Sequence, residues 1–248
     1  MSAADILLLS ATAFLTSALT AVVGAGGGTA LIAIMLQLLP PAAAIPVHGA
    51  VQLASNTTRV WLLRRHMAWP IIWRFALPMP FGVWLGLALF QGLPAAAIEL
   101  LIGCFVLLTL ALRRIGRWRD RDLPLWAFLP IGFVTGALNM VVGVIAPILG
   151  VLIVRRDLAK EATVGTLGFF GLVGNLLKIA GFSLIGFSFA QYGPLIAGMV
   201  PAAILGTRAG RHLLGRIDEG RFLLAFRIVL AALAVKLIAI DGLATLLG

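Results

Sequence analysis

Long apolar segments recur along the whole chain and leave only short connectors between them. Hydrophobic residues make up 61% of the sequence and charged residues only 11%. Runs of about 17 to 25 apolar residues are long enough to cross the hydrocarbon core of a bilayer as helices. Each spanning segment must satisfy its backbone hydrogen bonds internally, which favours helix. The sequence therefore predicts an all-α polytopic integral membrane protein with no separate soluble domain.

The basic residues account for a formal net charge of +10, which could suggest nucleic acid as a partner. They stand in short clusters between apolar segments, where membrane topology and anionic lipids explain them. We therefore expect the lipid bilayer as a partner and no nucleic-acid binding. No Lys or Arg precedes the first apolar segment, so we expect that segment to be retained rather than cleaved as a signal peptide.

The chain matches itself when it is shifted by 119 residues. The shift pairs FLTSALTAVVG (14–24) with FVTGALNMVVG (133–143) and gives thirteen identities across residues 14–63. Asn56 pairs with Asn175, and Arg59 pairs with Lys178. Because Asn and a cation are rare inside membrane segments, the match favours an internal repeat over compositional bias.

Each repeat contains a long glycine-broken segment followed by three helices. The expected segments are 5–39, 46–63, 70–91 and 97–112, then 125–154, 162–184, 190–207 and 222–240. We expect a first repeat over residues 1–116, a basic cytoplasmic linker over 117–124 and a second repeat over 125–248. Fourteen of the nineteen Lys and Arg residues fall in four connectors: Arg64 and Arg65; Arg113, Arg114, Arg117, Arg119 and Arg121; Arg155, Arg156 and Lys160; Arg208, Arg211, Arg216 and Arg221.

The positive-inside rule places these four connectors in the cytoplasm. Segment 125–154 then has basic connectors at both ends, so it must return to the side from which it entered, as a re-entrant or V-shaped helix pair. The same shape for 5–39 gives three crossings per repeat, an inverted relation between the repeats, and both termini on the periplasmic side. Inverted repeats with broken helices are typical of secondary transporters. The alternative is a parallel repeat with four plain crossings in each half.

The stretch GAGGG (24–28) interrupts the first segment. Freed backbone groups cannot face lipid, so the break must be buried or line an aqueous cavity. The half-helix that begins near Thr29 would present unpaired N–H groups to an anion. Gly143 to Pro147 occupy the equivalent place in the second repeat. An alternative is that Gly24 and Gly28 only allow close helix packing.

Polar residues share one face of the helix that follows the first break. They are His48, Gln52, Ser55, Asn56 and Arg59. Asn175 and Lys178 give the second repeat a matching amide and cation. Polar groups this deep normally face a bundle interior or a water-filled path. The alternatives are a structural role for His48 and snorkelling of Arg59 and Lys178 toward the membrane surfaces, as expected for Arg74, Arg227 and Lys236.

The GAGGG break, the following Asn and cation, and the repeat of both after a basic loop resemble the TauE/SafE sulfite exporter family over essentially the whole chain. The resemblance implies a bacterial or archaeal transporter of sulfur-containing anions such as sulfite, sulfoacetate or other organosulfonates, located in the cell inner membrane. The second repeat departs from the pattern because Ile145, Ala146 and Pro147 replace glycines.

We therefore expect a secondary transporter that exports a small sulfur oxyanion by alternating access, and not an enzyme. The expected substrate-binding residues are Gly26, Gly27, Gly28, His48, Gln52, Asn56, Arg59, Asn175 and Lys178. No pattern for a metal, nucleotide or other cofactor is present. Proton coupling would need His48 or Glu99, and a homo-oligomer is compatible with the sequence. An anion channel and a non-transporting membrane scaffold are the alternatives.

Overall fold

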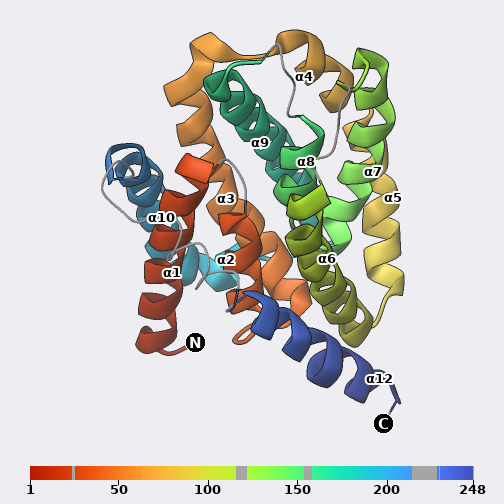
Figure 1. Ribbon diagram of the computed structural model, residues 1–248. Helices are drawn as coiled ribbons and strands as arrows, with labels where there is room; N and C mark the ends of the chain where they lie inside the picture. The colour runs from red at the N-terminus through yellow and green to blue at the C-terminus, as the bar shows by residue number, and fades with distance from the viewer. Residues whose placement is uncertain (24–25, 116–121, 154–157, 214–227, 229, 248) are drawn as a thin grey trace.

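The computed structural model describes residues 1–23, 26–115, 122–153, 158–213, 228 and 230–247, and this part of the chain is helical without strands (Figure 1). The first half contains α1 (Ala3–Val23), α2 (Gly27–Met35), α3 (Pro41–Leu63), the 3-10 turn η1 (Arg64–His66), α4 (Trp69–Ala76), α5 (Met79–Gly92) and α6 (Ala95–Ile115). The second half contains η3 (Leu125–Ala127), α7 (Phe128–Val141), α8 (Ala146–Leu152), α9 (Lys160–Leu184), η4 (Phe189–Tyr192), α10 (Gly193–Leu213), the π-helical η5 (Leu237–Ala244) and α12 (Thr245–Leu247).

The expectation of an all-α polytopic membrane protein is confirmed. Four helical stretches are long and apolar enough to cross a membrane, namely Ala3–Ala21, Trp69–Gly92, Glu161–Leu184 and Phe189–Gly210. Several residues used in the topology prediction lie outside the described part of the chain: Gly24, Arg117, Arg119, Arg121, Arg155, Arg156, Arg216, Arg221 and Arg227. Most of the expected linker and the start of the expected segment 222–240 lie outside it too.

Prolines set two helix boundaries that differ from the expected ones. Helix α3 begins at Pro41 rather than at Pro46, because Pro41 takes the first helical position and Pro46 is accommodated inside the helix. The expected segment 70–91 is divided into α4 and α5. Pro78 caps α5, and Pro80 follows in its first turn. A proline lacks the N–H that would continue the preceding helix.

Both long segments break at glycines with positive φ angles. Gly26 has φ 109° and precedes α2, and Gly143 has φ 81° and precedes α8. At Gly27, a Cβ atom would overlap the carbonyl oxygen of Thr16, two turns back in α1. The chain therefore reverses at the first break, and α2 starts by packing against α1. Only glycine allows this approach and this backbone conformation.

Helices α3 and α9, which carry the two Asn and cation pairs, pack against each other in opposite directions. The Arg59 side chain lies on Gly168, and the Lys178 side chain lies on Gly49. Between these contacts, Asn56 lies against Gly171. Residue numbers rise along α3 as they fall along α9, so the helices are antiparallel. A shift of 119 residues pairs Gly49 with Gly168 and Arg59 with Lys178. The contact of Arg59 with Gly168 is therefore equivalent to the contact of Lys178 with Gly49, as across a two-fold axis.

A second pair of packing contacts also obeys the repeat. Gly206 and Gly210 of α10 pack on the backbone of Phe14 and Ala18 in α1. Gly82 and Gly86 of α5 pack in the same way on Phe133 and Ala137 in α7, which are 119 positions after Phe14 and Ala18. Small residues allow this backbone approach in membrane bundles. Gly82 and Gly206 are 124 positions apart instead of 119. The second repeat therefore has five more residues before α10 than the first repeat has before α5.

The two ends of the bundle differ in character. The start of α1 and the end of α12 lie toward the same end in Figure 1, and η1 lies at the opposite end. Near η1, Trp61, Trp69 and Trp73 are exposed, and Arg64 stacks on Trp61 with its guanidinium carbon 4.3 Å from the ring centroid. Tryptophan and arginine with this placement are typical of a membrane–water interface.

The glycine packing predicts a sharp difference between two small substitutions. In Gly206→Ala, the added Cβ would overlap the carbonyl oxygen of Phe14, so we expect a loss of about 1 to 3 kcal/mol of stability. Gly92→Ala is the control, because no atom lies within 4 Å of the added Cβ. Thermal unfolding of both variants in detergent measures the difference. Equal melting temperatures for the two variants would contradict the packing.

Candidate functional site

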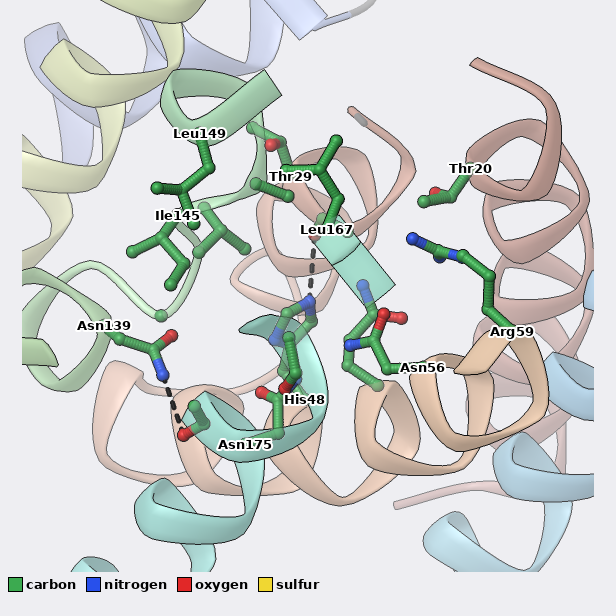
Figure 2. A pocket seen from close by; sticks show the side chains of 17 residues that line it. Thr20, Thr29, His48, Asn56, Arg59, Asn139, Ile145, Leu149, Leu167 and Asn175 are labelled. Atoms are coloured by element: carbon green, nitrogen blue, oxygen red, sulfur yellow. Dashed lines mark hydrogen bonds between the residues drawn. The ribbon is translucent and has the colours of Figure 1, made fainter. Parts of the chain in front are cut away.

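A pocket lies between the two helix breaks and draws its lining from α1, α2, α3, α7, α8 and α9 (Figure 2). Water-sized molecules have about 40 Å³ of space within it. The lining residues are Thr20, Gly28, Thr29, His48, Gln52, Asn56, Arg59, Asn139, Gly143, Val144, Ile145, Ala146, Leu149, Leu167, Gly171, Gly174 and Asn175. Of the predicted substrate-binding residues, the structure brings Gly28, His48, Gln52, Asn56, Arg59 and Asn175 together here.

Arg59 is the cation that faces this pocket. Its side chain is buried with 4% exposure, and Nε has no hydrogen-bond partner among the described residues. Figure 2 shows the guanidinium directed toward the side of the pocket where Thr20 lies. In the part of the chain that the structure describes, no carboxylate pairs with Arg59. A buried cation without a counter-ion is costly, so an anion in the pocket would stabilise it.

Two amide side chains and a hydroxyl line the same pocket without a hydrogen-bond partner among the described residues. Asn56 and Gln52 line the pocket, and neither is engaged by a hydrogen bond there. Thr29 Oγ1 is buried and also lacks a partner. Ala30 N donates to Gly26 O at 3.2 Å at the start of α2, and the N–H groups of Gly28 and Thr29 precede this bond in the first turn. All of these donors belong to the first repeat.

His48 holds the first break. Its Nε2 lies 2.9 Å from the carbonyl oxygen of Gly28. A carbonyl oxygen only accepts hydrogen bonds, so Nε2 carries the proton and donates it. The other ring nitrogen, Nδ1, is buried without a partner among the described residues. The contact gives His48 a structural task in addition to its place in the pocket lining.

Lys178 holds the second break in the corresponding way. Its ammonium group donates to the carbonyl oxygen of Gly143 at 2.6 Å, and its side chain is fully buried. Lys178 is absent from the residues that line the pocket. The two repeat-equivalent cations therefore differ here, since Arg59 faces the pocket and Lys178 is bound to backbone.

Three polar residues in the pocket escaped the sequence analysis. They are Thr20, Thr29 and Asn139. Thr20 and Asn139 lie one turn before their breaks and are 119 positions apart. The internal alignment therefore pairs two polar residues here, which is a signal that could have identified them. Thr20 Oγ1 donates to Thr16 O at 2.8 Å, and Asn139 Nδ2 donates to Gly174 O at 2.9 Å. Asn175 Nδ2 is occupied similarly, by Gly171 O at 2.7 Å.

Two of the predicted glycines stand behind the pocket rather than in its lining. Gly26 provides the positive φ angle before α2, and Gly27 packs on Thr16. Their contribution is the sharp turn that places Gly28 and Thr29 at the pocket. The second break offers fewer backbone N–H donors, because α8 has only seven residues and begins with Ala146 and Pro147.

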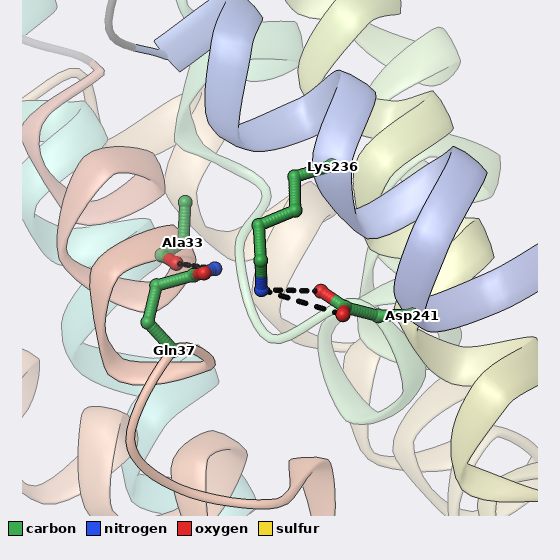
Figure 3. Close-up of polar contacts among 4 residues, drawn as sticks. All are labelled: Ala33, Gln37, Lys236 and Asp241. Atoms are coloured by element: carbon green, nitrogen blue, oxygen red, sulfur yellow. Dashed lines mark hydrogen bonds and ion pairs between the residues drawn. The ribbon is translucent and has the colours of Figure 1, made fainter.

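A separate polar group lies on the last helix, away from the pocket lining. Lys236 Nζ pairs with Asp241 at 3.1 Å and 3.3 Å from its two carboxylate oxygens, and Gln37 lies nearby with its amide donating to Ala33 O at 3.1 Å (Figure 3). The expected snorkelling of Lys236 is thus accompanied by an ion pair with Asp241. Glu99, the expected carboxylate candidate for proton coupling, is half-buried on α6 and does not line the pocket.

Comparisons with known proteins agree with this architecture. The family model described as sulfite exporter TauE/SafE matches residues 9–237, which is almost the whole chain. No curated protein and no solved structure matches the chain. Members of this family are membrane transporters rather than enzymes, which implies a small anionic substrate and a multi-pass location in the bilayer. A helical membrane bundle with a cation facing a pocket between two broken helices fits this match, and the chain belongs to the TauE/SafE sulfite exporter family.

Proposed function

We propose that the protein is a secondary transporter that exports a small sulfur oxyanion, such as sulfite or an organosulfonate, across the cell inner membrane. The observation that carries the proposal is the buried Arg59 guanidinium, which faces the pocket without a counter-ion among the described residues. Asn56, Gln52 and Thr29 add polar groups to the lining of the same pocket. An arginine fork matches the oxygens of a tetrahedral oxyanion with charge-assisted hydrogen bonds.

The proposed mechanism is alternating access by two inverted repeats that rock around the bound anion. Its support is the antiparallel packing of the repeat-equivalent helices α3 and α9 and the reciprocal contacts of Arg59 with Gly168 and Lys178 with Gly49. If α3 and α9 cross the membrane, a two-fold axis that relates antiparallel helices lies in the membrane plane, as in other inverted-repeat transporters. The exposed Arg64 and Arg65 favour a cytoplasmic location for the η1 end.

We further propose that Arg59 and Lys178 exchange tasks between the two access states. Arg59 binds the anion in the state described here, and Lys178 stabilises the second break through Gly143. In the opposite state, repeat equivalence gives Lys178 the pocket-facing position. This proposal assigns Lys178 to substrate contact in only part of the cycle.

Replacement of Arg59 tests the binding site directly. For Arg59→Gln, uptake of radiolabelled sulfite into proteoliposomes should fall at least about tenfold, because a charge-assisted hydrogen bond contributes about 1.5 to 3 kcal/mol. Arg74→Gln is the matched control, since Arg74 is exposed and its guanidinium donates to Pro70 O at 2.7 Å. Full flux in a folded Arg59→Gln protein would reject the site. Counterflow by the wild type identifies a transporter, whereas its absence with much faster flux identifies a channel.

Replacement of Lys178 separates binding from conformational change. Lys178→Met keeps an apolar stem on Gly49 but cannot donate to Gly143 O. We expect the maximal transport rate to fall at least about fivefold, because an unsatisfied buried carbonyl costs about 1 to 3 kcal/mol, while the Kd for sulfite changes much less than in Arg59→Gln. Equal losses of affinity in the two variants would show that both cations bind the anion together in one state.

The position of the C-terminus tests the inverted arrangement. A fluorescent protein that matures only in the cytoplasm, fused after the last residue, should remain dark. Alkaline phosphatase, which is active only in the periplasm, should be active at the same position. The opposite pattern would place the C-terminus in the cytoplasm and overturn the proposed topology.

A further inference from the structure

His48 carries a hydrogen-bond acceptor that no described residue satisfies. Its Nε2 donates to Gly28 O at 2.9 Å, so in a neutral imidazole the other nitrogen, Nδ1, has a lone pair and no proton. Nδ1 is buried without a partner among the described residues, and His48 lines the pocket with 2% exposure. A buried acceptor without a partner is costly. A donor on the occupant of the pocket would remove this cost.

The charges around His48 favour the neutral imidazole. Lys178 of α9 acts on the ring electrostatically, and its side chain packs on Gly49, the residue after His48. Arg59 is the charged residue that α3 itself contributes to the lining. The lining residues described on α1, α2, α7, α8 and α9 include no titratable side chain. A second ring proton would therefore add a third positive charge here without a counter-ion among them.

Two amides of the second repeat also keep their acceptor atoms free. Asn139 Nδ2 donates to Gly174 O at 2.9 Å, and Asn175 Nδ2 donates to Gly171 O at 2.7 Å. These bonds occupy the NH2 group of each amide and leave its oxygen, which can only accept. Figure 2 shows His48 in the middle of the pocket, between Arg59 on one side and Asn139 on the other. The lining thus combines one cationic donor with several free acceptors.

The space in the pocket requires one small ion to meet both demands. Water-sized molecules have about 40 Å³ there, and one water needs roughly 10 to 15 Å³. An occupant of a few heavy atoms therefore fits. The negative charge that binds Arg59 and the donor that binds Nδ1 must belong to the same compact ion.

We propose that His48 Nδ1 selects anions that carry a hydrogen-bond donor, so that the protein transports its oxyanion in the singly protonated form. The anionic oxygens bind Arg59, and the remaining proton, as in hydrogen sulfite, is donated to Nδ1. Sulfite and sulfate dianions offer acceptors only and leave Nδ1 unpaired. This inference rests on the proposed function of the Arg59 site and adds the protonation state of the ion.

The selection joins proton movement to anion movement. Each hydrogen sulfite ion carries its own proton across the membrane. The imidazole of His48 accepts a hydrogen bond from that proton but does not bind it, so its ring remains neutral. Transport of acid then needs no carboxylate in the pocket, and the described lining contains none.

Sulfamate and methanesulfonate are a matched pair of probes for this acceptor. Both are singly charged tetrahedral anions, but sulfamate has an NH2 group where methanesulfonate has a methyl group. In competition against radiolabelled sulfite uptake into proteoliposomes, sulfamate should inhibit at least about fivefold more strongly, because methanesulfonate leaves a buried acceptor unpaired. Sulfate should also inhibit more weakly than sulfamate. Equal inhibition by sulfamate and methanesulfonate in the wild type would overturn the inference.

Replacement of His48 locates the effect. His48→Leu removes Nδ1 and introduces the residue type of Leu167, its equivalent in the second repeat. The ratio of the two inhibition constants should fall to about one, because no buried nitrogen then distinguishes the ions. A role limited to the Gly28 contact would weaken both ions together and leave the ratio unchanged. His66→Leu is the matched control and should keep the ratio, because His66 is exposed and does not line the pocket.

The pH dependence provides a test without a substitution. Hydrogen sulfite loses its proton near neutral pH, so above that pH the half-saturating concentration of total sulfite should rise about tenfold per pH unit. Sulfamate keeps its charge and its donor in this range, so its constant inhibition controls for titration of the protein. A sulfite affinity independent of pH would overturn the inference. If uptake still depends on Arg59 in that case, the proposed function stands, whereas full flux in Arg59→Gln rejects both.

Discussion

Backbone groups that are released inside a membrane must find partners, and the structure depends on how this chain meets that requirement. Two long segments break inside the bundle. At each break, a side chain of the following helix donates a hydrogen bond to a backbone carbonyl oxygen. His48 donates to Gly28, and Lys178 donates to Gly143. At the second break one residue also packs between the halves, because the Lys178 side chain lies on Gly49 of α3.

The side chain that donates to the break differs between the two halves. At the first break His48 is the donor, and Arg59 faces the pocket. At the second break the cation itself, Lys178, donates to the Gly143 carbonyl oxygen. Polar donors therefore gather on one side and aliphatic carbon on the other. An amphipathic pocket is the result, although the two repeats share their helix order.

Sequence periodicity and charge predicted most of the architecture. The identities between residues 14–63 and their partners identified both breaks. Of the paired polar residues, Asn56, Arg59 and Asn175 line the pocket and Lys178 does not, and their role in substrate binding stays a prediction. The ungapped shift of 119 residues does not align α5 with α10. The second repeat has five extra residues before Gly206 and Gly210, compared with the first repeat before Gly82 and Gly86. The sequence also could not show that Lys178 binds the backbone while Arg59 does not, because this difference depends on which hydrogen bonds each side chain makes in the folded protein.

The antiparallel contacts between α3 and α9 also have a definable centre. The residue numbers in each contact have the same sum, since 49 + 178, 56 + 171 and 59 + 168 all equal 227. A position and its equivalent 119 residues later satisfy this sum only at Ala54 and Val173. These two residues therefore mark the centre of the reciprocal contacts between α3 and α9. If the proposed alternating access turns one helix against the other about this centre, the ends of α3 and α9 move farther than Ala54 and Val173 do.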